Sequence, residues 1–293
     1  MTFDDRGICT ACIFHQNKAP KINWAAREEE FKIICKEIKS KKNNYDCVVP
    51  FSGGKDSASI AYKLKFKYGL NPLLVTFAPI IQNEIGMQNR AEMNKMGFTN
   101  ILVTPNDKIS RNLSKRFLIE RGNPKIHWNA GIAAAPIKIA SEKKIDLIFY
   151  AEDPMLVYGG RITKTDSSRH ITVSRINETW IGDDVMNWVD ENITEYDLEP
   201  YNVPLNYVKN QKAVFFGYFF PWDIVKNYTY IKEKINFKVG KDRSVGTFTN
   251  FDSLDDIMDD LYYYMQYIKF GFGRCTRDVS RHIQYGHMSS KEG

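Results

Sequence analysis

The chain has 293 residues, of which 43% are hydrophobic and 13% aromatic, so it is globular and long enough for one large domain or two smaller ones. Its net charge of +6 suits small polyanions as well as RNA and does not decide between them. The sequence has no run of 18 apolar residues and no signal peptide, and its five cysteines do not make a disulfide framework in a chain this long, so we expect a cytoplasmic protein without a membrane partner.

The N-terminal segment, residues 1–22, contains Cys9 and Cys12 in the sequence Cys-Thr-Ala-Cys. We expect a small cysteine knuckle there, because two cysteines at this spacing supply half of a zinc site. The missing ligands could be His15, Cys275 or residues outside this chain. The alternative is a pair of thiols that bind no metal.

The predicted core, residues 23–160, begins with an amphipathic helix from Asn23 to about Lys39. A buried strand ending at Val49 then leads into a glycine turn and a helical segment. Such a turn directs backbone N–H groups and a helix N-terminus at one point, which is a place for phosphate. The turn consists of Ser52, Gly53, Gly54, Lys55, Asp56 and Ser57. Its lysine adds a mobile cation and its aspartate can hold Mg²⁺, whereas the alternative is a turn that binds no ligand.

Strands and helices alternate through the rest of the core. We expect strands at 73–78, 101–104 and 146–150 and helices at 84–96, 106–120 and 128–140, which predicts a parallel sheet with helices on both faces. The carboxyl ends of its strands share the edge with the phosphate loop.

Several polar residues follow the last predicted strand of the core. Glu152 and Asp153 come directly after it and are candidate magnesium or substrate contacts, although Asp153 could instead form an Asp-Pro turn. Tyr158, Gly159, Gly160 and Arg161 come next, with glycines that permit close approach and an arginine suited to a carboxylate or phosphate. We therefore assign these four residues to the substrate.

The alternation stops after residue 161, and we interpret residues 161–293 as a largely helical substrate-binding or partner region of mixed structure. A strand is expected at 214–220 and a helix at 255–270, whose tyrosines at 262, 263 and 264 are interpreted as packing residues. The glycine-rich sequence 269–274 could bind an anion, although a loop of this kind is weak support by itself.

The turn from Ser52 to Ser57 is not a Walker A sequence, because the spacing of its glycines differs. It resembles the pyrophosphate loop (PP-loop) of the N-type ATP pyrophosphatases. The resemblance implies an adenine nucleotide α-hydrolase-like fold that binds ATP and Mg²⁺, with the pyrophosphate on the loop and the adenine against the backbone of Thr76 and Phe77. A substrate oxygen would then attack the α-phosphorus.

The whole chain resembles the N-acetyl sugar amidotransferases of bacterial surface-polysaccharide (LPS O-antigen) and nonulosonic-acid biosynthesis. The residues that carry the resemblance are 3–12, 49–57, 71–76, 150–154, 158–160 and 269–274. It implies conversion of a sugar acetamido group to acetamidino, with Lys55, Asp56 and Glu152 as catalytic residues and a separate glutaminase subunit as the source of ammonia. Family members usually carry a second cysteine pair upstream and a longer C-terminal tail, so we expect any active-site element from that tail to be absent.

Two other interpretations remain open. The first is a PP-loop enzyme that thiolates tRNA, for which Cys9 and Cys12 would hold zinc or a cluster; against it, basic residues form only short runs such as 110–121, and we do not expect nucleic acid as a partner. The second is a nucleotide-binding subunit without turnover.

Overall fold

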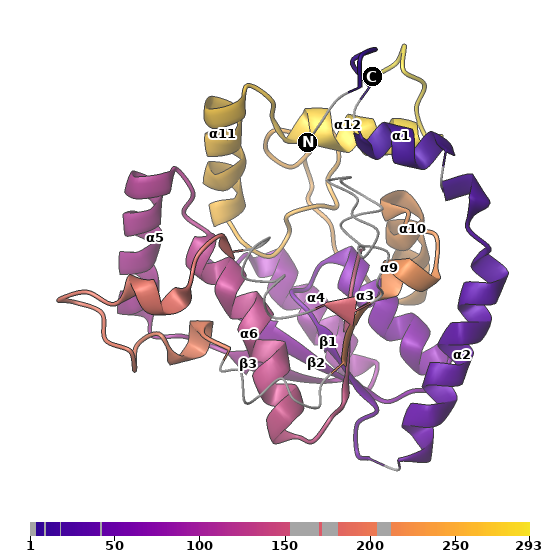
Figure 1. Ribbon diagram of the computed structural model, residues 1–293, viewed down its shortest axis with the longest axis horizontal. Helices are drawn as coiled ribbons and strands as arrows, with labels where there is room; N and C mark the ends of the chain where they lie inside the picture. Colours follow the sequence, from indigo (N-terminus) through magenta and orange to yellow (C-terminus); the bar gives the residue numbers. More distant parts are fainter. Residues whose placement is uncertain are drawn as a thin grey trace.

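The structure is a computed structural model that describes residues 4–8, 10–17, 19–41, 43–152, 170–171, 181–203 and 212–293. A sheet with the strand order β3-β2-β1-β4-β6-β5 forms its centre (Figure 1). The strands are β1 (Cys47–Pro50), β2 (Pro72–Phe77), β3 (Thr99–Val103), β4 (Leu147–Tyr150), β5 (His170–Ile171) and β6 (Lys212–Phe215). All pairings are parallel except that of β5 with β6, which confirms the predicted α/β fold with a parallel sheet.

Helices cover both faces of the sheet because successive residues of its central strands point to opposite sides. Val49 packs in one hydrophobic cluster and Val48 in the other. The first cluster includes residues of α2 (Trp24–Ser40), α3 (Lys55–Tyr62), α4 (Glu84–Lys95), α9 (Phe216–Phe219) and α10 (Ile224–Lys234). The second includes α5 (Asp107–Arg121), α6 (Ile126–Glu142) and the short helices η4 (Val185–Trp188) and η5 (Glu199–Tyr201).

Polar caps fix the beginnings of several helices. The side chain of Asn23 accepts a hydrogen bond from the N–H of Ala26 at 3.0 Å, as expected at the start of α2, and Asn106 does the same for α5. Gly122 ends α5 with a φ of 59°, a left-handed conformation that glycine adopts easily. The π-helix η2 (Lys63–Lys67) continues α3, and η1 (Ala19–Lys21) precedes α2.

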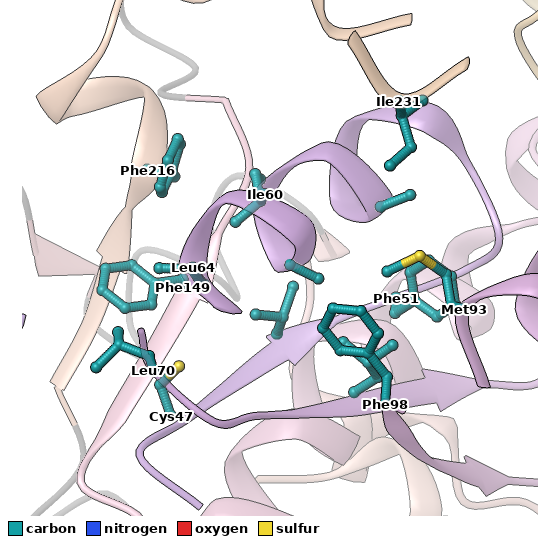
Figure 2. Packing of buried hydrophobic residues seen from close by; sticks show 14 of the residues in the cluster. Cys47, Phe51, Ile60, Leu64, Leu70, Met93, Phe98, Phe149, Phe216 and Ile231 are labelled. Carbon is teal, nitrogen blue, oxygen red and sulfur yellow. The ribbon is translucent and has the colours of Figure 1, made fainter. Parts of the chain in front are cut away.

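The strand expected at 214–220 is too long. β6 ends at Phe215, and the next four residues form the single helical turn α9. An aromatic cluster explains the turn, because the ring of Phe31 lies 5.6 Å from that of Phe216 and 5.2 Å from that of Phe219. Figure 2 shows Phe216 beside Phe149 and Leu64 in this core. β6 also pairs with β4, so the sheet continues past residue 160.

The helix expected from residue 255 begins three residues later, as α11 (Met258–Phe270). The residues before it pair instead with the loop after β2, because the N–H of Ile257 donates to the carbonyl of Ile81 at 2.9 Å and that of Asn83 donates to Asp255 at 3.0 Å. α12 (Arg274–Gln284) follows and lies beside α1 (Thr10–Asn17) at the two chain ends (Figure 1). No helix in the described ranges combines the length and the apolar character needed to cross a membrane.

Candidate nucleotide-binding site

A cavity of about 490 Å³ lies at the carboxyl ends of β1 and β2. This is the position at which parallel α/β sheets bind ligands, and the volume suits a small molecule. The walls come from the phosphate loop, the end of β2, the start of α6 and the C-terminal segment. The lining includes Phe51, Ser52, Gly54, Lys55, Asp56, Ser57, Val75, Phe77, Lys125, Trp128, Ile132, Glu152, Asp252, Ser253, Asp255, Asp259, Tyr262, Tyr263, Arg274 and Arg277.

The phosphate loop connects β1 to α3, as predicted, and its conformation requires glycine at one position. Gly53 has a φ of +106°, and a Cβ atom there would lie 2.5 Å from the carbonyl oxygen of Gly86. Gly86 in turn lies against the backbone of Asp255, where a Cβ would be 2.6 Å from the Cα atom. The phosphate loop, the start of α4 and the C-terminal segment are therefore in direct backbone contact.

Lys55 is the first residue of α3 and is only 4% exposed. Its Nζ contacts Asp56 at 2.9 Å and also pairs with Asp252 of the C-terminal segment. Burial alone would lower the pKa of Lys55, but the two carboxylates raise it. Burial would likewise raise the pKa of Asp252, yet the charge of Lys55 lowers it to about 2. Lys55 and Asp252 are thus both charged at neutral pH.

The carboxylate of Asp56 is held from two sides. Lys55 contacts one oxygen, and the amide of Asn227 in α10 donates to the other at 3.1 Å. The Asn227 carbonyl oxygen accepts from Lys63 at 3.2 Å, and because a lysine only donates, this contact fixes which end of the amide faces Asp56. Sequence reasoning missed Asn227, which is 171 residues away from its partner.

A second buried lysine lies at the other end of the cavity. Lys125 precedes α6, pairs with Asp256 at 3.0 Å and with Asp259, and its Nζ lies 4.0 Å from the ring centroid of Trp128. Two effects raise the pKa of the neighbouring Asp255 to about 6: burial, which is the larger, and the charge of Asp259. This wall therefore combines a paired lysine with a carboxyl group that titrates near neutral pH.

The wall between the two lysines is apolar and includes Phe77, Trp128 and Ile132. α6 passes close to Phe77, since a Cβ on Gly131 would lie 2.2 Å from its ring. The Thr76 side chain points to the opposite face of the sheet from Phe77. There its hydroxyl oxygen accepts a hydrogen bond from the Asn100 side-chain amide at 3.0 Å. Of the two residues assigned to the adenine, only Phe77 thus faces the cavity with its side chain.

The C-terminal segment supplies a basic and aromatic wall. Arg274 is 2% exposed and donates to the Ser253 hydroxyl at 2.6 Å, and its guanidinium lies 4.6 Å from the ring centroid of Tyr263. Arg277 lies 5.0 Å from the same ring and pairs with Asp278 at 3.0 Å. Tyr263, interpreted from the sequence as a packing residue, therefore both orders two arginines and lines the cavity.

The structure brings Glu152 together with the predicted phosphate-loop residues. Glu152 lines the cavity with Ser52, Lys55, Asp56 and Ser57. The predicted Tyr158, Gly159, Gly160 and Arg161, together with Asp153 and Cys9, lie outside the described residues. Cys12 lies in α1, where Gln284 contacts its Sγ at 3.7 Å, and the described residues contain no group of three or more His, Cys, Asp or Glu side chains that could hold a metal.

Sequence comparison identifies the C-terminal segment. Residues 245–293 match the model of the C-terminal domain of WbpG-like LPS biosynthesis proteins. The match bears out the link to LPS biosynthesis in the resemblance drawn from the sequence, and the C-terminal segment is similar to this WbpG-like domain. This WbpG-like domain provides every cavity residue from Phe251 to Arg277.

Other similarities cover a limited segment or have low sequence identity. A segment of 75 residues is 33% identical to the uncharacterized protein MJ1599 of Methanocaldococcus jannaschii and spans 26% of each chain, about a quarter of the length of that relative. The U34-tRNA thiolase NcsA of Methanococcus maripaludis aligns with 91% of this chain and 76% of its own at 16% identity and a TM-score of 0.42. The NMN synthetase of Francisella tularensis aligns with 93% of this chain and 97% of its own at 13% identity and a TM-score of 0.36.

Proposed function

We propose that this protein is an ATP-dependent amidotransferase that converts the acetamido group of a bacterial sugar to acetamidino and releases AMP and pyrophosphate. The observation that carries the proposal is the shared cavity. A pyrophosphate-type loop forms one wall, and a segment that matches LPS biosynthesis proteins forms an adjoining wall. This arrangement puts a wall suited to ATP next to a wall suited to a second substrate.

ATP fits the cavity in one direction. The apolar wall of Val75, Phe77 and Trp128 suits the base, and the phosphate loop suits the β- and γ-phosphates at the start of α3. Lys55 is held where it can contact the leaving pyrophosphate. Carboxylate oxygens of Asp56 and Asp252 both contact the Lys55 ammonium group. Carboxylate oxygens are also suitable ligands for Mg²⁺, and a bound Mg²⁺ would neutralise part of the phosphate charge.

The reaction needs activation of a poor electrophile, because the nitrogen lone pair of an acetamido group is delocalised into its carbonyl. In the proposed reaction, the amide oxygen attacks the α-phosphorus of ATP, and the bond from that phosphorus to pyrophosphate breaks. Ammonia then adds to the activated carbon, AMP leaves with the original oxygen, and one proton is released. No nucleophilic side chain is required, so the protein acts by positioning and electrostatics.

The WbpG-like domain would bind the sugar. Its arginine pair, Arg274 and Arg277, suits the phosphate of a nucleotide-linked sugar or the carboxylate of a nonulosonic acid. None of the described cysteines, Cys12, Cys35, Cys47 and Cys275, lines the cavity. We accordingly assign the supply of ammonia to a separate glutaminase subunit.

Pyrophosphate release tests the proposal. The protein is incubated with ATP, Mg²⁺ and ammonium chloride, and with a panel of nucleotide-linked acetamido sugars, free and CMP-linked nonulosonic acids, and bulk tRNA. We expect release that depends on one sugar, with a product in which NH replaces O by mass spectrometry. Asp56→Asn should abolish it, whereas Asp242→Asn on the exposed surface should not.

The other outcomes contradict the proposal. Release that depends only on tRNA would assign the protein to base modification. The absence of release with every substrate, together with retained ATP binding, would assign it to the non-catalytic subunits.

A further inference from the structure

The segment that follows α12, residues 285–293, folds back onto this helix. The N–H of His287 donates to the carbonyl of His282 in α12 at 2.8 Å. Gly293 packs against the same helix, since a Cβ atom there would lie 2.4 Å from the Val279 side chain. The segment therefore holds the backbone of His287 close to the end of α12.

The side chain of His287 contacts Asp223, the residue at which α10 begins. Its Nε2 atom lies 2.9 Å from both carboxylate oxygens, and because a carboxylate only accepts, Nε2 is the donor. Asp223 is 5% exposed and caps α10 by accepting hydrogen bonds from the N–H groups of Val225 and Lys226 at 3.0 Å. The C-terminal segment and the first turn of α10 thus share one buried carboxylate.

The capped turn of α10 leads directly to Asn227. The N–H of Asn227 donates to the carbonyl of Asp223 at 2.9 Å, so the two residues are one helical turn apart. The side-chain amide of Asn227 in turn donates to Asp56 at 3.1 Å. A continuous set of contacts therefore connects His287 with the carboxylate proposed for Mg²⁺.

Tyr285 supports the same placement of the C-terminal segment. Burial raises the pKa of Tyr285 to about 12 against the charge of Arg281. The charges of Asp223, Glu152 and Asp56 add to the increase, which requires that these carboxylates lie near the phenol. Since the first turn of α12 lines the cavity, this helix and the segment after it link the wall proposed for the sugar with the phosphate-loop end of the site.

We propose that His287 is a positioning residue for the nucleotide site, acting through Asp223. It holds the first turn of α10, and with it the Asn227 amide that orients Asp56 toward ATP and Mg²⁺. Without His287, the Asp223 carboxylate can turn toward the exposed ammonium of Lys226, 3.7 Å away, and the first turn of α10 is held less firmly. The inference rests on the proposed function only in that Asp56 binds the metal that accompanies ATP.

Calorimetric titration with ATP tests this role. We expect His287→Ala to weaken ATP binding about fivefold or more in Mg²⁺ and less in excess EDTA, because Asp56 acts through the metal. His287→Gln should recover most of the affinity, because its side-chain amide can still donate to Asp223. Lys291→Ala, at an exposed position of the same segment, is the matched control and should bind ATP as the wild type does.

Two further variants test the route from His287 to Asp56. Asp223→Ser can still cap α10 but is too short to reach His287, so it should weaken binding as much as His287→Ala does. It also provides the same comparison if His287→Ala does not fold. When His287→Ala is added to Asn227→Ala, no further loss should follow, because the first substitution acts through the second residue.

Three results would overturn the inference. They are an unchanged affinity of His287→Ala for ATP in Mg²⁺, an equal loss with and without Mg²⁺, and additive losses in the double variant. A wild type that binds no ATP would overturn the proposed function as well. A wild type that binds ATP but releases no pyrophosphate with any substrate would reject only the proposed reaction, since the binding comparison does not depend on turnover.

Discussion

At the scale of single residues, the site depends on how its charges are held rather than on any unusual residue type. Asp56 and Lys55 were predicted from the motif, but Asn227, which orients the carboxylate, comes from a distant helix. We predict that Asn227→Asp lowers kcat/KM for ATP at least about tenfold, or about 1.4 kcal/mol, because it places a second carboxylate against Asp56. The measurement is pyrophosphate release at varied ATP.

The neighbouring residue provides the control for this variant. Lys226 is exposed and lies on the solvent side of the same helix, so Lys226→Ala should leave the ATP dependence unchanged. An Asn227→Asp enzyme with wild-type kinetics would mean that the amide does not orient Asp56.

A second residue-scale prediction concerns the turn of the phosphate loop. Gly53→Ala should abolish nucleotide binding, because the new Cβ would lie 2.5 Å from the Gly86 carbonyl and the φ of +106° is unfavourable for alanine. Gly182→Ala separates the two causes, since Gly182 also has a positive φ, +68°, but no atom within 4 Å of the added Cβ. Calorimetry with ATP measures the difference. Equal and small effects of both substitutions would show that the close contact with Gly86 is not important.

At the scale of elements, the segment before α11 fastens the WbpG-like domain to the core. The Asp256 carboxylate is buried and accepts hydrogen bonds from the N–H groups of Ile81 and Met258, both at 3.0 Å. It also pairs with Lys125 at 3.0 Å. We predict that Asp256→Ala costs about 3–5 kcal/mol of unfolding free energy, because it leaves a buried lysine and two N–H groups short of partners.

Urea unfolding measures this cost, and Asp242→Ala, at an exposed position in the same region, is the matched control. The variant should also bind ATP more weakly, because the cavity wall from Asp252 to Asp259 is attached through this contact. A loss below about 1 kcal/mol would place the attachment elsewhere.

The elements also show what the sequence could predict. The strands β1 to β4 and the loop were predictable because each is a short apolar run between helical segments and the turn has a distinctive sequence. The start of α11 was not, because the acidic run from Asp255 to Asp260 looks like a helix beginning. The backbone of residues 255 and 257 instead forms hydrogen bonds with residues 83 and 81, which are far away in sequence. Local patterns carry no signal for such a contact.

At the scale of the whole molecule, the cavity joins two distant parts of the chain. Asp252, Asp255 and Asp259 line the cavity, although no sequence motif assigned them to the site. Nothing local indicated that they face the phosphate loop more than 190 residues earlier, as the contact of Lys55 with Asp252, 197 residues apart, requires. The residues on this side of the cavity lie within the segment 245–293 that matches the WbpG-like C-terminal domain.

The same arrangement makes stability depend on pH. Burial and the charge of Asp259 raise the pKa of Asp255 from 3.8 to about 6, so folding favours the protonated carboxyl group. Its stabilisation is complete below the unfolded pKa and is lost as the pH rises through about 6. We therefore predict that, as the pH rises from about 5 to about 8, the stability of Asp255→Asn increases relative to that of the wild type. Thermal unfolding of both proteins at a series of pH values measures this difference.

Asp252 gives the opposite behaviour and hence the control. Its pKa is lowered to about 2 by Lys55 against the effect of burial, so its stabilisation is present above the unfolded value of 3.8 and is lost only as the pH falls toward 2. The loss of stability in Asp252→Asn should accordingly be constant between about pH 5 and pH 8. If the stability difference between Asp255→Asn and the wild type is also constant between these pH values, Asp255 does not titrate near neutral pH. The charge of Asp259 then does not raise the pKa of Asp255 in the folded protein.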